Sequence, residues 1–113
     1  MSFTLDMSKA AHRDVQQVLS HALEQFGELQ HRRYKLLIRD AIRHLVFHPD
    51  QRPAKPLTEI APNVWRLHLA QKGARARHFF LYSISGDTVR GQRLLHDAMG
   101  LKRHLPDDLS SAE

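Results

Sequence analysis

Residues 64–95, VWRLHLAQKGARARHFFLYSISGDTVRGQRLL, decide the fold of this chain. In the first part of this stretch, Val64–Ala70, the apolar residues Trp65, Leu67 and Leu69 alternate with polar ones. This alternation is typical of a half-buried β-strand, because successive side chains of a strand point to opposite faces. We therefore predict a strand over Val64–Ala70, with Trp65 part of the core.

Two further strands are predicted in the same stretch. Arg77–Ile84 carries apolar residues on both faces of a strand: Phe80, Tyr82 and Ile84 on one, Phe79 and Leu81 on the other. Ser85-Gly86-Asp87 is a tight-turn sequence, since glycine adopts positive φ without penalty. Thr88–Leu95 is the third strand. Consecutive strands joined by short loops pair antiparallel, so we expect a three-stranded antiparallel meander.

The residues upstream predict a strand followed by two helices. Ser2–Met7 alternates like a short strand, and Ser8 is a candidate N-cap for a helix that follows it. Apolar residues then recur every three or four positions until Gly27, which indicates an amphipathic helix. A second amphipathic pattern runs from about Glu28 to Phe47 and ends before His48-Pro49, because the residue before proline avoids the helical region. The two helices are expected to form an antiparallel hairpin.

The remaining segments are harder to assign. Asp50–Pro62 contains prolines that block regular pairing, so we expect an irregular connection, with Leu57 and Ile60 packed on the core. His96–Leu105 is expected to form one or two helical turns, and residues 107–113 a frayed polar tail.

The predicted fold class is α+β in the order β-α-α-β-β-β, within a single domain spanning residues 1–113. The helical hairpin is expected to cover one face of the sheet. Nothing in the sequence is left to cover Phe79, Leu81 and Leu94, so we expect an uncovered apolar face, which usually marks a partner site.

Composition limits the function classes. The chain has no cysteine, which excludes a disulfide framework and thiolate chemistry. No stretch approaches the roughly 20 apolar residues of a membrane span, and the N-terminus lacks a secretion signal. We therefore expect a soluble, cytoplasmic protein. With 17 Lys and Arg against 12 Asp and Glu, the net charge of +5 predicts attraction to an acidic partner.

Several stretches together are similar to a known family. They are Ala22–Gly27 (ALEQFG), then Tyr34, Leu45 and Pro49, and toward the end Leu94–Met99 (LLHDAM) and Lys102–Pro106 (KRHLP). These residues resemble the ParE branch of the ParE/RelE superfamily, the toxins of bacterial type II toxin–antitoxin modules. The resemblance extends from Phe3 to about Pro106, and its C-terminal stretch is the most specific part. The chain departs from the family pattern at Phe79, Ser83 and Gly100, where the family often carries arginine, arginine and aspartate.

This resemblance implies a function and its partners. ParE-type toxins act on DNA gyrase and block it with cleaved DNA, and they are held silent by an antitoxin that often binds its own operator. The implied partners are a ParD-like, DNA-binding dimeric antitoxin and DNA gyrase, with nucleic acid contacted only through the target complex and no membrane. No cofactor is implied. One alternative is a RelE-type relative that cuts messenger RNA on the ribosome; another is a degenerate, non-toxic member that only binds antitoxin.

Site residues follow from these alternatives. Expected antitoxin contacts are Leu19, Leu23, Arg75, Arg77, Phe79 and Leu81. Expected target contacts are Lys72, His96, Lys102, Arg103 and His104. A ParE-type toxin needs no catalytic residue. A ribonuclease would use His96 as general acid or base, with Lys72, Arg75 and Arg77 stabilising the charge on phosphorus. A ribonuclease would also need a carboxylate or second base nearby, and Asp97, the neighbour of His96 along the chain, is expected to point the wrong way to supply it.

Three other features have ordinary structural interpretations. His44 and His48 are spaced to hold a metal, but without a third ligand they are better explained as histidines at a helix C-terminus, and no metal is expected. The basic run His31-Arg32-Arg33 is best interpreted as a solvated helix face. Gly91, inside the third predicted strand, indicates either a bulge or the close approach of another backbone.

Overall fold

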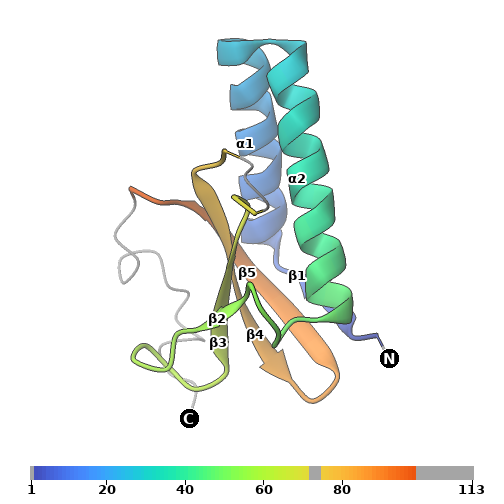
Figure 1. Cartoon of the computed structure of the whole chain (residues 1–113), viewed down its shortest axis with the longest axis vertical. Helices are drawn as coiled ribbons and strands as arrows, with labels where there is room; N and C mark the ends of the chain where they lie inside the picture. Colours follow the sequence, from blue (N-terminus) through green and yellow to red (C-terminus); the bar gives the residue numbers. More distant parts are fainter. Residues whose placement is uncertain (1, 72–74, 99–113) are drawn as a thin grey trace.

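The computed structural model describes residues 2–71 and 75–98. Its elements are β1 (Thr4–Met7), α1 (Lys9–Phe26), α2 (Glu28–Phe47), β2 (Lys55–Pro56), β3 (Val64–His68), β4 (His78–Ser85) and β5 (Thr88–His96). The two helices run side by side as a hairpin that lies against the sheet and extends beyond one end of it (Figure 1). The predicted α+β order is confirmed, and the helical turns and tail expected after Ala98 lie outside the described residues.

The helix ends follow from local chemistry. Ser8 caps α1, since its hydroxyl accepts a hydrogen bond from the Ala11 N–H at 3.0 Å. Gly27 separates the helices with a φ of +88°, a conformation that side chains disfavour. His48 ends α2 directly before Pro49. All three boundaries agree with the sequence prediction.

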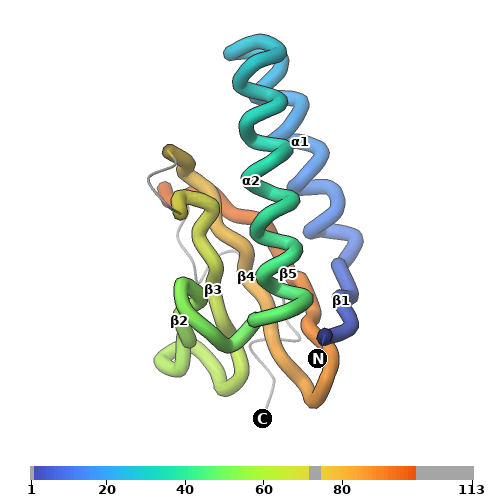
Figure 2. Tube along the Cα trace, turned by 45° about the vertical axis from the view of Figure 1, so that its right-hand side comes forward, coloured from blue at the N-terminus to red at the C-terminus, as the bar shows by residue number. Residues whose placement is uncertain are grey.

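The sheet has five strands in the order β1-β5-β4-β3-β2. The strands β3, β4 and β5 pair antiparallel as the predicted meander, and β1 pairs parallel with β5 (Figure 2). The prediction that Asp50–Pro62 is wholly irregular is wrong at one point. Lys55 and Pro56 form the short strand β2 against Arg66 and Trp65. Proline is tolerated there because β2 lies at the sheet edge, where the missing N–H removes no ladder bond.

A bulge in β5 shapes the junction between the sheet and α1. Leu81 is opposite Arg93 while Tyr82 is opposite Gly91, so one extra residue, Gln92, lies on β5. Two backbone carbonyls of the bulge accept hydrogen bonds from Ser8. The Ser8 N–H donates to the Gly91 carbonyl and the Ser8 hydroxyl to the Gln92 carbonyl, both at 2.8 Å. The predicted bulge is confirmed. The close approach at Gly91 comes from the chain's own β1, because an added Cβ would lie 2.5 Å from the sulfur of Met7.

The main core lies between the hairpin and one face of the sheet. Its buried members come from α2, the loop after it and the sheet: Tyr34, Ile38, Ala41, Leu45, Ala54, Leu67, Leu69, Phe80, Tyr82, Val89 and Leu94. Trp65 packs against this cluster, so the predicted alternation of β3 is confirmed. Tyr82 is fully buried, and its hydroxyl donates to the Pro49 carbonyl at 2.6 Å.

The expectation of an uncovered apolar face is wrong. Leu94 belongs to the main core, and Phe79 and Leu81 are buried in a second cluster on the opposite face. The segment Leu57–Ala61 contributes to that cluster, with Leu57 buried and Ile60 packed beside it. Polar residues of β3 add cover: the His68 ring stacks on Phe79, and the Arg66 guanidinium lies 6.0 Å from the centre of the same ring. An irregular segment and amphipathic side chains therefore cover the apolar residues of this face, as the helical hairpin covers those of the other face.

Within residues 2–71 and 75–98, no helix is long and apolar enough to cross a membrane.

Candidate functional site

A cleft of about 830 Å³ lies between the helical hairpin and the end of the sheet formed by His78 and His96. One wall is apolar and comes from α1, through Val18, Ala22 and Phe26. The polar side chains that line the cleft are Gln17, His21, Gln30, Arg33, Tyr34, Arg75, Arg77, His78 and His96. No carboxylate is among the described lining residues, so the cleft has a cationic character.

The arginines of the cleft are positioned by α2. Arg33 donates from its guanidinium to the Arg75 carbonyl at 2.7 Å and to the Gln30 side chain at 3.1 Å. These bonds fasten the segment before β4 to the helix. Arg75 and Arg77 are exposed, so their guanidinium groups are accessible to a partner. Three arginines around one opening favour the binding of carboxylates or phosphates.

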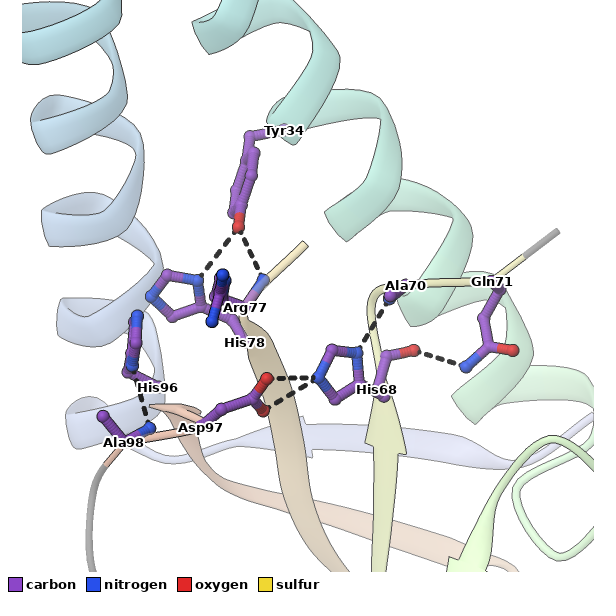
Figure 3. Close-up of polar contacts among 9 residues, drawn as sticks. All are labelled: Tyr34, His68, Ala70, Gln71, Arg77, His78, His96, Asp97 and Ala98. Atoms are coloured by element: carbon purple, nitrogen blue, oxygen red, sulfur yellow. Dashed lines mark hydrogen bonds and ion pairs between the residues drawn. The ribbon is translucent and has the colours of Figure 1, made fainter. Parts of the chain in front are cut away.

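Tyr34 connects α2 to the start of β4. Its hydroxyl accepts a hydrogen bond from the Arg77 N–H at 3.0 Å and lies 3.2 Å from Nδ1 of His78 (Figure 3). Because the oxygen already accepts from Arg77, its own proton can be donated to His78. The phenol therefore holds both the backbone and a side chain of the cleft floor.

His78 is kept neutral at physiological pH. Burial, together with the neighbouring His96 ring, lowers the pKa of His78 from 6.5 to about 4. The two rings meet edge to face, with centres 5.0 Å apart, because His78 and His96 are cross-strand partners. A neutral imidazole with so low a pKa is a weak base and is not an acid at neutral pH.

His96 is the histidine best placed to act in the cleft. Its Nδ1 accepts a hydrogen bond from the Ala98 N–H at 3.0 Å, so the neutral ring carries its proton on Nε2. The ring lines the cleft at the end of β5. The sequence prediction that His96 lies just past the strand is corrected by one residue, since His96 is the last residue of β5.

Asp97 bonds to a histidine on another strand. Its carboxylate lies 2.8 Å from Nε2 of His68 in β3, and Nδ1 of the same ring accepts from the Ala70 N–H at 2.9 Å (Figure 3). The expectation that Asp97 points the wrong way to assist its neighbour His96 agrees with this pairing. Both ring nitrogens of His68 are engaged within the chain, so this pair fastens β3 to the end of β5 and leaves Asp97 unavailable to His96.

The predicted site residues are only partly brought together. Arg75, Arg77 and His96 line the cleft, whereas Lys72, Lys102, Arg103 and His104 lie outside the described residues. Leu23 is exposed and Leu19 is half-buried against the main core. Phe79 and Leu81 are buried on the opposite face of the sheet, away from the cleft.

Sequence reasoning missed six of the polar cleft residues: Gln17, His21, Gln30, Arg33, Tyr34 and His78. Arg33 was assigned to a solvated face, yet it is half-buried and bonded to the β4 segment. The available signal was the strand register, which makes His78 a direct neighbour of His96. His44, the other histidine considered, lies 2.9 Å from the Gln51 carbonyl at the end of α2, and no three metal-ligand side chains converge among the described residues.

The fold is similar to solved toxin–antitoxin structures. A chain of the chromosomal ParDE system from P. aeruginosa aligns with 83% of this chain and 95% of its own, at 16% identity and a TM-score of 0.66. A chain of the E. coli DinJ-YafQ toxin–antitoxin complex aligns with 87% of this chain and 96% of its own, at 13% identity and a TM-score of 0.59. A chain of a second structure of that complex aligns with 85% of this chain and 94% of its own, at 16% identity and a TM-score of 0.51.

Comparison of the sequence alone adds no relative, because no family model matches it and no curated protein matches it. At these identities the structural likeness establishes the fold. The helical hairpin on one face of the sheet and the antiparallel meander are those that the sequence predicted, whereas the parallel pairing of β1 with β5 makes the sheet mixed and corrects the prediction of an antiparallel sheet. The chain has the α+β fold of ParE/RelE-type toxins.

Proposed function

We propose that this chain is the toxin of a bacterial type II toxin–antitoxin module and that it acts as ParE-type toxins do, by binding DNA gyrase. The observation that carries the proposal is the match over 95% of a chain from a ParDE system, together with the ParE-like residues around His96. A toxin that works by contact needs an accessible cationic surface and no catalytic pair.

The three histidines at the end of the sheet, His68, His78 and His96, favour binding over bond cleavage. RNA cleavage by acid–base catalysis needs one group that accepts a proton from the 2′-hydroxyl and one that donates a proton to the leaving oxygen. His68 has both ring nitrogens occupied, and the pKa of His78, lowered to about 4 mainly by burial, makes it a weak base. This leaves His96 as the one histidine suited to proton transfer among those joined at this end of the sheet.

The partner that silences the toxin is, in this proposal, a ParD-like antitoxin. Arg75 and Arg77 are exposed at the cleft and are suited to carboxylates of an antitoxin segment, and Leu23 offers an exposed apolar contact at the hairpin tip. Leu19 is partly accessible beside Leu23. Phe79 and Leu81 are not antitoxin contacts in this proposal, because contact with them requires the second cluster to open.

The test of the target uses purified chain, gyrase, ATP and relaxed plasmid. The expected result is linear plasmid DNA after denaturation of the trapped complex, increasing with the amount of chain and suppressed by prior addition of the antitoxin. Arg77→Glu serves as a control for the antitoxin step: it weakens suppression without disturbing the core, since Arg77 is exposed. Absence of trapped, cleaved DNA at a chain excess would contradict the gyrase assignment.

A second candidate is favoured by one observation, the position of His96 in a cleft lined by Arg33, Arg75 and Arg77. This arrangement suits a ribosome-dependent endoribonuclease in which arginines hold the phosphate and His96 moves a proton. The test is primer extension on messenger RNA after induction in cells. Cleavage within codons that disappears in His96→Ala would establish this candidate, and intact messenger RNA during growth arrest would exclude it.

A further inference from the structure

The outer side of α2 carries an apolar stripe that the cleft does not use. Leu29, Leu36 and Phe47 are 79%, 45% and 48% exposed. They are separated by seven and eleven residues, which is close to two and three helical turns, so they lie on one line along the helix. The buried residue Ile38 lies about two and a half turns after Leu29, on the opposite side.

Arginine side chains lie beside the same apolar stripe. Arg32, Arg39 and Arg43 are exposed and recur after seven and four residues, so they lie along one flank of the apolar line. Two acidic residues of α2 lie nearby: Glu28, which is exposed one turn before Arg32, and Asp40, which is 67% exposed with its carboxylate 3.9 Å from the Arg39 guanidinium. The surface is therefore apolar at its centre and positive at its edge.

We infer that this surface, Leu29–Phe47 on the outer side of α2, docks an acidic amphipathic helix of another protein. Leucine and phenylalanine side chains at helical spacing match the anchors of a helix that packs lengthwise. Carboxylates along the edge of such a helix would meet Arg32, Arg39 and Arg43. The stripe is about 27 Å long, so the partner helix needs about five turns.

The charges of this surface favour an acidic helix over a second copy of the chain and over a nucleic acid. A second copy of the chain, packed through the same stripe, would set the three arginines of one α2 against those of the other, with only Glu28 and Asp40 on each side to compensate. A nucleic acid would use the arginines and leave Leu29 and Leu36 in contact with water or phosphate. An acidic helix satisfies both the apolar line and the positive flank.

The docking surface is separate from the cleft. The cleft takes Gln30, Arg33 and Tyr34 from α2, and none of the stripe residues lines it. The α2 helix lies on the outside of the fold, in front of α1 in the view of Figure 2. The inference therefore does not depend on which target the toxin acts on, and a partner on the stripe and one in the cleft can bind together.

The test uses a fluorescein-labelled synthetic helix of about five turns, with leucines on one face and glutamates beside them. A peptide with lysines in place of the glutamates is the control probe. Anisotropy titrations with the full chain are expected to show binding to the acidic peptide that weakens with salt, and no binding to the basic peptide. Leu29→Ser and Arg43→Glu are each expected to weaken binding at least about tenfold.

A matched variant on α1 separates the stripe from surface charge in general. Arg13→Glu also reverses the charge of an exposed arginine, and it is expected to bind the acidic peptide like the original chain. All three variants replace exposed side chains, and circular dichroism confirms that each retains its helices. A loss in Arg13→Glu equal to that in Arg43→Glu, or equal binding of the basic peptide, would overturn the inference.

Two further outcomes would also overturn it. The first is a DNA duplex that binds the chain with an affinity lowered by Arg43→Glu and unaffected by Leu29→Ser, which would make the surface a nucleic-acid face. The second is a dimer of the chain alone, detected by sedimentation, that Leu29→Ser dissociates. That result would make the stripe a contact between copies.

Discussion

The Tyr34 hydroxyl lies 3.2 Å from Nδ1 of His78 while accepting a hydrogen bond from the backbone N–H of Arg77. Tyr34 and His78 are 44 positions apart in the sequence, so this contact joins the second turn of α2 to the start of β4. The same strand end carries the cleft arginines and faces His96. One phenol therefore fixes the geometry of the candidate site.

Replacing Tyr34 by phenylalanine removes both hydrogen bonds and keeps the ring. We expect Tyr34→Phe to lower the free energy of unfolding by about 1–2 kcal/mol, because a partly buried amide and a half-buried imidazole lose their partner. Urea unfolding measures the loss, and hydrogen exchange of the Arg77 amide is expected to accelerate. The control is Tyr82→Phe, which loses the bond to Pro49 and leaves Arg77 exchange unchanged. Unchanged Arg77 exchange in Tyr34→Phe would contradict the assignment.

The lowered pKa of His78 makes stability depend on pH in a defined window. In the unfolded chain His78 has a pKa near 6.5, whereas burial and His96 lower the pKa in the folded chain to about 4. Between these values the unfolded state binds the extra proton, so the free energy of unfolding falls as pH decreases from about 6.5 to 4 and is unaffected above about 7. Solvent access to the half-buried ring limits the effect to about 1–2 kcal/mol.

The measurement is urea unfolding of the original chain and of His78→Gln across that window. The difference between them is expected to shrink toward low pH, because the glutamine variant lacks the group that resists protonation. His12→Gln, which removes an exposed histidine on α1, is the control and is expected to follow the original chain. Parallel pH curves for His78→Gln and the original chain would show that His78 titrates normally.

The junction between α1 and β5 depends on a partly buried ion pair. Asp14 accepts from Arg93 at 2.7 and 3.1 Å and from the Leu94 N–H at 3.0 Å, and its side chain is 12% exposed. We expect Asp14→Asn to cost about 2–4 kcal/mol, since the guanidinium is left without its counter-charge. Asp40→Asn, which removes an exposed pair, is expected to change stability by less than about 0.5 kcal/mol. Comparable losses in the two variants, measured by thermal unfolding, would contradict this account.

Gly91 and Met7 are predicted to be energetically coupled. An alanine at position 91 would bring its Cβ 2.5 Å from the Met7 sulfur, so the methionine must move. We expect Gly91→Ala to cost about 1–2 kcal/mol. In a Met7→Ala background the same change should cost less, because the clash is absent. Additive losses in the double variant would show that the clash with Met7 is not the cause.

Local pattern was sufficient to predict most of the fold. The alternation of Trp65, Leu67 and Leu69, the Ser8 cap and the Gly27 break are each properties of neighbouring residues, and all three are confirmed. The parallel pairing of β1 with β5 joins Thr4 to Thr88 and depends on tertiary packing. The strand β2 has two residues, one of them proline, which is too short for any periodic signal.

The candidate site was less predictable for a related reason. Arg75, Arg77 and His96 were identified as single residues of suitable chemistry, and the structure brings them to one cleft. Their neighbours Tyr34 and His78 come together only through tertiary contacts, which no local pattern encodes. The second face of the sheet was misjudged because Leu57–Ala61 and the stem of Arg66 cover apolar surface without forming a helix or long strand.

The central proposal, that this chain acts by binding gyrase, is tested most directly by the gyrase cleavage assay with the original chain and His96→Ala side by side. The account predicts that both produce linear plasmid DNA, because trapping requires contact and no proton transfer by His96. Failure of both to trap cleaved DNA, together with messenger RNA cleavage by the original chain that His96→Ala abolishes, would contradict it.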